Sequence, residues 1–275
     1  MAKGGFTERD YLAVAKKSIV RAQNIPQYPK LLFYARKKQG KTTLAMTAGA
    51  PHEILIIDPE KGAEYKREFN PYIWPITQWE DMQDVYGALR TGKLTPKYLN
   101  MGDKQDEPFK WVVVDGLTRI NNFALHFVRR EQEERDLSRH PGFVDRRDYG
   151  KSGELLKQML TNFHGLKMGV IYTAQEKMKT LGEWDDDDDD TEGSEVIYIP
   201  EIPDAVRNQV NSLVDVIGRV YTVRVEIKGE MVTRRRLRIG VSDKYDTGAR
   251  TEYDLPEVLK SPTVPKLLQL MSEGA

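Results

Sequence analysis

The sequence predicts an α/β protein whose mainly parallel sheet carries helices on both faces and an antiparallel hairpin at one edge. Three observations support this prediction. Short continuous apolar runs, without the polar alternation of half-exposed strands, recur between residues 31 and 173. Segments with helical spacing separate these runs, which is the order expected of a parallel sheet. Near the C-terminus, two strand-like stretches flank the turn Lys228-Gly229-Glu230.

The residues before the first apolar run predict a helix and a linker. Thr7 and Asp10 resemble a helix start, with Thr7 as the N-cap and an acid three residues on. Leu12, Ala15 and Ile19 then share one face of a helix over residues 10–21. The Pro-containing segment 24–29 ends this helix. We expect residues 1–29 to lie outside the core and to serve as an oligomerisation element.

Residues 30–255 form the predicted core. Buried strands are predicted at 31–34, 54–57, 111–114 and 168–173, with a short strand at 72–76. Helices are predicted at 42–48, 79–89, 121–135 and 153–163. We expect a long loop at 176–203, hairpin strands at 213–226 and 231–241, and a partly helical tail at 256–275.

Composition excludes several classes of protein. Hydrophobic residues make up 39% and charged residues 31%, which is typical of a soluble folded chain and not of a disordered one. No apolar run approaches the ~20 residues of a membrane span, and the first residues contain no apolar signal core. The chain has no cysteine, so disulfides and thiolate metal sites are excluded. We therefore expect a cytoplasmic protein, in the host cytoplasm if a phage encodes it.

The charges balance overall but not locally. The 42 basic and 42 acidic residues cancel, which argues against a protein that coats DNA by electrostatics alone. Residues 1–50 carry ten basic and two acidic side chains, whereas residues 183–195 carry nine acidic and no basic ones. A local basic face therefore still permits nucleic-acid binding.

A phosphate-binding loop follows the strand predicted at 31–34. The usual pattern is G-x-x-x-x-G-K-[ST], and Ala35 stands here where the first glycine normally lies. That departure removes no phosphate-binding group, and the strand before and helix after the motif disfavour a chance match. Lys41 would reach the β and γ phosphates, and the Thr42 hydroxyl would bind Mg²⁺. The pattern predicts ATP and Mg²⁺ binding by Arg36, Lys37, Lys38, Gln39, Gly40, Lys41, Thr42 and Thr43.

Polar residues at the ends of later strands extend this site. Asp115 follows a buried strand and can hold Mg²⁺, or it can be a strand-end turn residue. Glu60 can activate water for attack on the γ phosphate, with Asp58 as its rival and a surface carboxylate as the simpler alternative. Gln175 can sense the γ phosphate, or it can merely cap its strand.

These segments together resemble the RecA-like ATPase core. The resemblance is carried by the phosphate loop, Ile57-Asp58-Pro59-Glu60, Val113-Val114-Asp115-Gly116 and Tyr172-Thr173-Ala174-Gln175-Glu176. More narrowly, the chain is similar to the phage RecA-like single-strand annealing ATPases, often labelled phage nucleotide-binding or AAA-domain proteins. That similarity covers roughly residues 30–250. It includes Asp58–Gly62, Asp148-Tyr149-Gly150 and Asp243–Arg250.

The resemblance implies roles for particular residues. It makes Glu60 the general base, and Gln175 the link between nucleotide and a DNA-binding loop. It implies that Lys244 and Arg250 reach a neighbouring subunit's nucleotide. It also implies that single-stranded DNA lies against segments 135–151 and 176–203. The basic residues there are Arg139, His140, Arg146, Arg147, Lys151, Lys177 and Lys179. The implied partners are single-stranded DNA, further copies in a ring or filament, and a single-strand DNA-binding protein.

Simpler alternatives stand beside the basic and acidic segments. Arg146 and Arg147 can be solvated or can contact another subunit. The tract Asp185–Asp190 departs from what a DNA-binding loop should contain. It is interpreted first as a solvated loop, and less readily as a DNA-mimicking plug or a metal tract. Arg234, Arg236 and Arg238 would form one stripe on a strand, suited equally to an exposed edge, an interface or DNA.

The resulting expectation is a DNA-stimulated, oligomeric ATPase that acts on single-stranded DNA in phage recombination, annealing or replication. One alternative is a nucleotide-gated assembly protein without a DNA role. Another is a helicase or packaging motor, although a helicase would call for a further nucleic-acid-binding domain that the sequence outside the core does not suggest.

Overall fold

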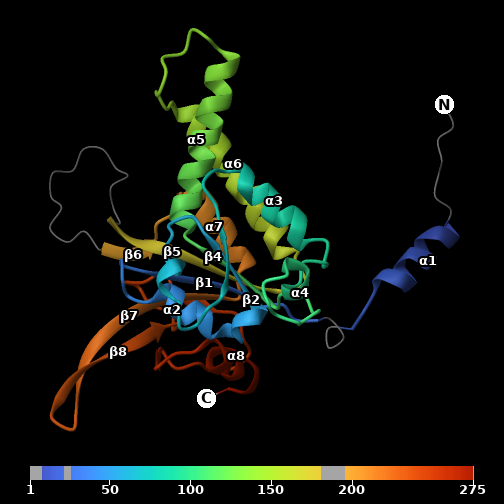
Figure 1. The fold of residues 1–275 in the computed structure, drawn as a ribbon. Helices are drawn as coiled ribbons and strands as arrows, with labels where there is room; N and C mark the ends of the chain where they lie inside the picture. Colours follow the sequence, from blue (N-terminus) through green and yellow to red (C-terminus); the bar gives the residue numbers. More distant parts are fainter. Residues whose placement is uncertain (1–7, 22–25, 181–195, 275) are drawn as a thin grey trace.

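The computed structural model describes residues 8–21, 26–180 and 196–274, and Figure 1 shows its central sheet with helices on both sides. The strands in the described residues are β1 (Lys30–Ala35), β2 (Ile54–Asp58), β3 (Tyr72–Pro75), β4 (Trp111–Asp115), β5 (Gly169–Thr180), β6 (Val196–Pro200), β7 (Val216–Ile227), β8 (Glu230–Arg238), β9 (Gly248–Ala249) and β10 (Val258–Lys260). Along the sheet they follow the order β10-β8-β7-β1-β5-β4-β2-β3.

The sheet is mainly parallel, as predicted. Strands β7, β1, β5, β4, β2 and β3 run parallel to their neighbours. β8 returns antiparallel beside β7, and β10 covers the outer edge of that hairpin. Two short antiparallel additions lie off this path, because β6 pairs with β5 and β9 pairs with the start of β7. The predicted α/β class and its antiparallel edge are therefore confirmed.

Helices cover both faces of the sheet (Figure 1). The α-helices in the described residues are α1 (Glu8–Ser18), α2 (Lys41–Ala45), α3 (Glu80–Leu89), α4 (Pro96–Leu99), α5 (Leu117–Arg135), α6 (Arg146–His164), α7 (Asp204–Leu213) and α8 (Val264–Glu273). Helices α3, α5, α6 and α7 pack on one face, and α2 and α8 on the other. Because β1 lies between the two layers, its side chains alternate between them: Leu32 and Tyr34 enter one core, and Leu31 and Phe33 the other.

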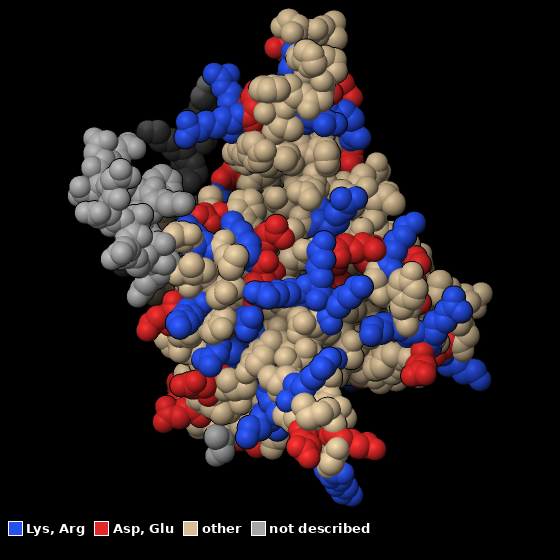
Figure 2. Space-filling model, turned by 90° about the vertical axis from the view of Figure 1, so that its left-hand side faces the viewer, with Lys and Arg blue, Asp and Glu red and all other residues tan. Residues whose placement is uncertain are grey.

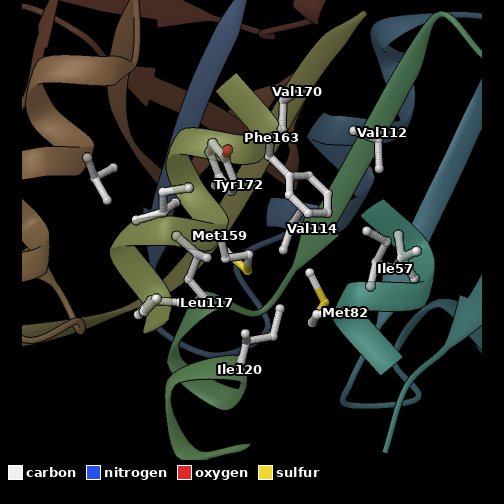
Figure 3. Packing of buried hydrophobic residues seen from close by; sticks show 14 of the residues in the cluster. Ile57, Met82, Val112, Val114, Leu117, Ile120, Met159, Phe163, Val170 and Tyr172 are labelled. Carbon is white, nitrogen blue, oxygen red and sulfur yellow. The ribbon is translucent and has the colours of Figure 1, made fainter. Parts of the chain in front are cut away.

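The larger core joins α3, α5 and α6 to the sheet. Phe163 of α6 is fully buried beside the valines of β4 and β5, and Met82 of α3 reaches toward Ile57 of β2 (Figure 3). Such burial contributes about 1.5–3 kcal/mol for each large apolar side chain. This packing holds the carboxyl ends of β1, β2, β4 and β5 in a fixed arrangement, and the candidate site lies there.

Two predictions about the region after residue 145 are wrong. Helix α6 begins at Arg146 and not at 153, because the Asp145 carboxylate caps it by accepting the N–H groups of Arg147 and Asp148. The segment 176–203 is not one long loop. β5 continues to Thr180, and β6 returns beside it. The tract Asp185–Asp190 and the N-cap predicted at Thr7 lie outside the described residues.

Helix α7 was not predicted, although its apolar residues have helical spacing. Val206 and Val210 are one turn apart and both fully buried, and Val206 lies 3.8 Å from where a Cβ on Gly153 of α6 would stand. Leu213 packs against the same core, so the apolar positions of α7 follow the i, i+4, i+7 spacing of an amphipathic helix.

Helix α1 extends away from the rest of the molecule (Figure 1). Its predicted apolar face is not covered, since Leu12 is 70% exposed and Ile19, just beyond the helix, is 76% exposed. Its role as an oligomerisation element stays a prediction.

Candidate nucleotide-binding site

The predicted phosphate loop connects the carboxyl end of β1 to the first turn of α2. Gly40 has a φ of 88°, a left-handed conformation that a side chain would strain, and Lys38 also has a positive φ of 64°. The loop is anchored from a distant strand. The Oε1 atom of Gln39 accepts hydrogen bonds from the backbone N–H of Thr222 at 2.8 Å and from its hydroxyl at 2.7 Å. These two hydrogen bonds therefore anchor the phosphate loop to β7.

A cavity of about 580 Å³ lies over this loop. Most of the predicted site residues line it, namely Lys37, Lys38, Gln39, Gly40, Lys41, Thr42, Thr43, Glu60, Asp115 and Gln175. They come from the carboxyl ends of neighbouring parallel strands, the usual place for ligands in open α/β sheets. Arg36 does not line the cavity, because its guanidinium pairs with Glu176 at 3.1 Å.

Thr42 and Asp115 form the centre of the candidate metal site. The Thr42 hydroxyl donates to Asp115 Oδ2 at 2.7 Å, and the Thr173 hydroxyl donates to Asp115 Oδ1 at 2.8 Å. Burial raises the pKa of Asp115, and these two hydrogen bonds act in the opposite direction. A hydroxyl and a carboxylate so placed fit Mg²⁺, which takes one or two protein oxygens beside phosphate oxygens and waters. The described residues hold no cluster of three or more His, Cys, Asp or Glu side chains that would suggest a protein-only cage.

Lys41 carries the positive charge closest to this centre. Its Nζ atom contacts the Ala35 carbonyl oxygen at 3.4 Å, a long contact that leaves the ammonium group able to turn toward a phosphate. Burial lowers the pKa of Lys41, whereas Asp115 and Glu60 raise it. A bound phosphate chain would supply the anionic partner that this half-buried cation has only in part.

The structure separates the two rival carboxylates after β2. Asp58 is 1% exposed, and its oxygens accept the backbone N–H groups of Glu60, Gly62 and Ala63 at 2.7 to 3.2 Å. It therefore shapes the turn. Glu60 lies on that turn with its carboxylate in the cavity, close to Gly116, where a Cβ would stand 3.4 Å from Glu60 Oε1. Of the two, Glu60 is the one free to act on a ligand.

Gln175 is tied to the start of helix α5 through its backbone. Its N–H donates to the Thr118 hydroxyl oxygen at 3.1 Å, and that hydroxyl donates to the Glu201 carbonyl at 2.9 Å. Glu201 closes the circuit, because its N–H donates to the Gln175 carbonyl at 2.7 Å. A displacement of Gln175 would therefore also displace the start of α5 and the residues that follow β6. Thr118 lies in no recognised motif, so nothing in the sequence marks it as a site residue.

Glu176 organises a second, aromatic cluster beside the site. Its almost fully buried carboxylate pairs with Arg36 and with Arg219 of β7. The Arg219 guanidinium lies 4.4 Å from the centre of the Tyr245 ring, and Tyr245 stacks on Tyr198 of β6. In the sequence, Glu176 stands out only as the end of the segment 172–176, and its pairing with Arg219 across 43 positions leaves no local signal.

The two residues expected to act on a neighbouring subunit lie apart from this cavity and from each other. Lys244 is exposed, and its carbonyl accepts the N–H of Tyr198, which pairs with Met178 in the carboxyl-terminal half of β5. Arg250 lies near the opposite end of the sheet, where its N–H donates to the Asp215 carbonyl just before β7. Only Lys244 is on the same side as the phosphate loop. Both roles stay predictions.

The residues expected to contact DNA are also dispersed. Arg146 and Arg147 are exposed at the tip of the α5–α6 hairpin, whereas Arg139 there is ion-paired with the buried Asp148. Lys177 and Lys179 lie on β5, and both face the carboxylate of Asp204. Figure 2 shows the side of the molecule that includes this tip, with Lys and Arg gathered across its middle and Asp and Glu between them. The basic face is thus interrupted by acidic groups.

The strand order, the phosphate loop and the Thr42–Asp115 pair together define a P-loop NTPase with a RecA-like core. The chain belongs to the AAA domain family, whose model matches residues 27–251.

Solved structures and curated proteins add little to this assignment. The KaiC-like protein PH0186 from Pyrococcus horikoshii OT3 is 13% identical, with 85% of this chain and 90% of that one covered at a TM-score of 0.40. The flagellar accessory protein FlaH from Methanocaldococcus jannaschii is 11% identical, with 93% and 92% covered at 0.35. No curated protein sequence matches the chain. No helix in the described part of the chain is both long and apolar enough to cross a membrane.

Proposed function

We propose that this protein is an oligomeric ATPase that acts on single-stranded DNA during phage recombination, annealing or replication in the host cytoplasm. The observation that carries the ATPase part is the direct hydrogen bond between Thr42 and Asp115, in a cavity that also holds Lys41 and Glu60. These are the groups that phosphoryl transfer to water needs: a cation for the phosphates, oxygens for a metal, and a carboxylate for the water.

Each group has a distinct part in the proposed reaction. The backbone N–H groups of the loop and the Lys41 ammonium bind the phosphates and orient the terminal one. Thr42 and Asp115 would hold Mg²⁺, which supplies positive charge to the β and γ oxygens when bound. Glu60 accepts the proton of the water molecule that attacks the γ phosphorus. The leaving product is ADP.

The DNA-binding part of the proposal is supported by the link between the nucleotide cavity and the basic tip of the α5–α6 hairpin. Gln175 is hydrogen-bonded to Thr118 in the first turn of α5, and α5 leads directly to the tip that carries Arg146 and Arg147. The tip also exposes Phe143 and Tyr149, at 60% and 59%. Exposed aromatic rings beside arginines suit single strands, because bases stack on rings while phosphates pair with cations.

We expect this protein to bind single-stranded DNA in the presence of ATP, and DNA to raise its ATPase rate. In the variant Arg146→Ala/Arg147→Ala, the affinity should fall. The slope of log K against log salt should flatten by about 1.4, since each lost phosphate contact contributes about 0.7 on single strands. Fluorescence anisotropy with a labelled oligonucleotide across a salt series measures both quantities.

The control variant Lys260→Ala/Lys266→Ala removes the same charge from β10 and α8, and it should leave the slope unchanged. Both lysines are exposed on elements remote from the α5–α6 tip in Figure 1. Absence of DNA binding at low salt, with a slowly hydrolysed ATP analogue present, would favour the nucleotide-gated assembly protein instead. The acidic partner of Lys177 and Lys179 and the uncovered apolar face near α1 support that second candidate.

A further prediction concerns a shared active site. If Lys244 completes a neighbour's site, Lys244→Ala should be inactive alone but regain activity when mixed with Lys41→Ala protein, and the same holds for Arg250→Ala if Arg250 has this role. In an equal mixture, about a quarter of the sites would combine an intact phosphate loop with an intact Lys244 or Arg250 from the neighbouring subunit. About a quarter of the wild-type activity should therefore return. ATPase assays of the two mixtures measure this separately for each residue.

Co-assembly of the mixed subunits is checked by pull-down of differently tagged copies. The position of Lys244 on the side of the phosphate loop favours it over Arg250. If a mixture co-assembles and stays inactive, the residue tested does not act on the nucleotide of a neighbouring subunit.

A further inference from the structure

A cation that the sequence analysis did not assign lies over the phosphate loop. The guanidinium of Arg235, on β8, helps to line the nucleotide cavity. A Cβ on Gly40 would stand only 2.6 Å from its Nη2 atom and 2.7 Å from its Nε atom. The side chain therefore lies directly against the glycine that precedes Lys41. A Cβ at position 40 would require this guanidinium to move aside.

The strand register explains why this arginine alone reaches the loop. Arg235 pairs across the hairpin with Thr222, whose N–H and hydroxyl bind Gln39 of the phosphate loop. Side chains alternate along a strand, so Arg235 shares a face with Leu237, which is fully buried in the core layer of α2. Arg234 and Arg236 point to the opposite face.

The Arg235 side chain is half-buried, and its Nε atom is enclosed by protein without a hydrogen-bond acceptor in the part of the chain that the structure describes. None of the described residues forms an ion pair with the side chain. Burial lowers the pKa of Arg235, and no carboxylate acts against this effect. A partly desolvated cation without an anionic partner is destabilising, which is typical of a group placed for a ligand and not for stability.

We propose that Arg235 binds the phosphate chain of the nucleotide held by its own subunit's loop. The proposal rests on the proposed nucleotide-binding function and adds a residue to it. An arginine fork matches phosphate oxygens in pairs, and its bond to a phosphate is charge-assisted. It would reach the phosphates from the side of β8, whereas Lys41 reaches them from α2. The hairpin β7–β8 thereby becomes part of the site, so bound nucleotide would fix the hairpin's position.

The test compares Arg235→Met with wild type and with Arg234→Ala. Removal of one charge-assisted contact should weaken ADP and ATP binding by about tenfold to a hundredfold, as measured by titration with a fluorescent nucleotide. Arg234→Ala removes the same charge from the exposed, opposite face of the strand and should bind as wild type does. Arg235→Lys keeps the charge but not the forked guanidinium. Its nucleotide affinity should lie between those of wild type and Arg235→Met.

A second readout separates ligand binding from a structural role. Without nucleotide, the melting temperature of Arg235→Met should equal or exceed that of wild type, because a half-buried cation whose Nε atom lacks a partner in the described structure is removed. The rise in melting temperature on adding Mg-ADP should shrink. A lower melting temperature without nucleotide, together with unchanged affinity, would overturn the proposal.

The outcomes distinguish this inference from the proposed function. If wild type binds neither ADP nor ATP, the nucleotide-binding function itself fails. If wild type binds and Arg235→Met binds equally well, only the role of Arg235 fails. If mixing Arg235→Met with Lys41→Ala protein restores binding, the guanidinium serves a neighbour's loop, and the assignment to its own subunit is overturned.

Discussion

Replacement of Lys41 by alanine is expected to abolish ATP hydrolysis and to weaken ATP binding. The ammonium group is the cation nearest the Thr42–Asp115 centre, and it is already partly desolvated. Loss of one electrostatic contact to the transferring phosphoryl group typically lowers the turnover number by about 10²–10³-fold. Phosphate release by the purified variant measures the effect on hydrolysis, and nucleotide titration measures the effect on binding.

The fold should tolerate this change, so the loss can be assigned to chemistry. The only hydrogen bond of the Lys41 ammonium in the described structure is the 3.4 Å contact to Ala35, which contributes little. Lys93→Ala removes an exposed lysine outside the site and serves as the charge-matched control. Unchanged turnover in Lys41→Ala, with wild-type melting behaviour, would contradict the phosphate-loop assignment.

The site could be predicted from the sequence where its residues stand next to strand ends. The loop 36–43, Asp115 and Gln175 stand at the ends of continuous apolar runs, and Glu60 lies two residues beyond the end of β2. Parallel strands bring their carboxyl ends to one edge. Local pattern and sheet topology together therefore place ten of the predicted residues in one cavity. No long-range information was needed for them.

Residues that reach the site from the hairpin could not be found in the same way. Gln39 meets Thr222 across 183 positions, and Arg235 reaches Gly40 only because β8 pairs with β7 in one particular register. A shift of one residue would point Arg234 or Arg236 at the loop instead. In the sequence, Arg235 is the middle of three adjacent arginines, and nothing local distinguishes it from the other two.

The start of α6 shows how capping and a nearby ion pair outweigh the low helix propensity of glycine. The sequence predicts that the helix begins at Gly153, after a loop over 135–151. Gly150 and Gly153 disfavour a helix by about 1 kcal/mol each. The Asp145 cap and the ion pair of Arg139 with the buried Asp148 stabilise the first turns. The basic tip is consequently ordered into a helix, with Arg146 and Arg147 at fixed positions.

The second large effect is expected for Glu60→Gln. The amide keeps the size and hydrogen-bonding reach of the carboxylate but cannot take the proton of the attacking water. ATP affinity should therefore stay near that of wild type while turnover falls by about 10²–10⁴-fold, the usual contribution of a general base. Glu64→Gln, an exposed carboxylate four residues on, should turn over ATP as wild type does.

If Asp58 shapes the turn and Glu60 is the base, Asp58→Asn should lower stability and reduce turnover only in part. The Asp58 carboxylate accepts three backbone N–H groups, and an asparagine side chain has only one acceptor oxygen, so at least one of these bonds is lost. A buried donor left without a partner costs about 1–3 kcal/mol, which should lower the melting temperature. Turnover should then fall partially, through displacement of Glu60. A variant Asp58→Asn that melts as wild type does but loses the chemical step, beside an active Glu60→Gln, would make Asp58 the base.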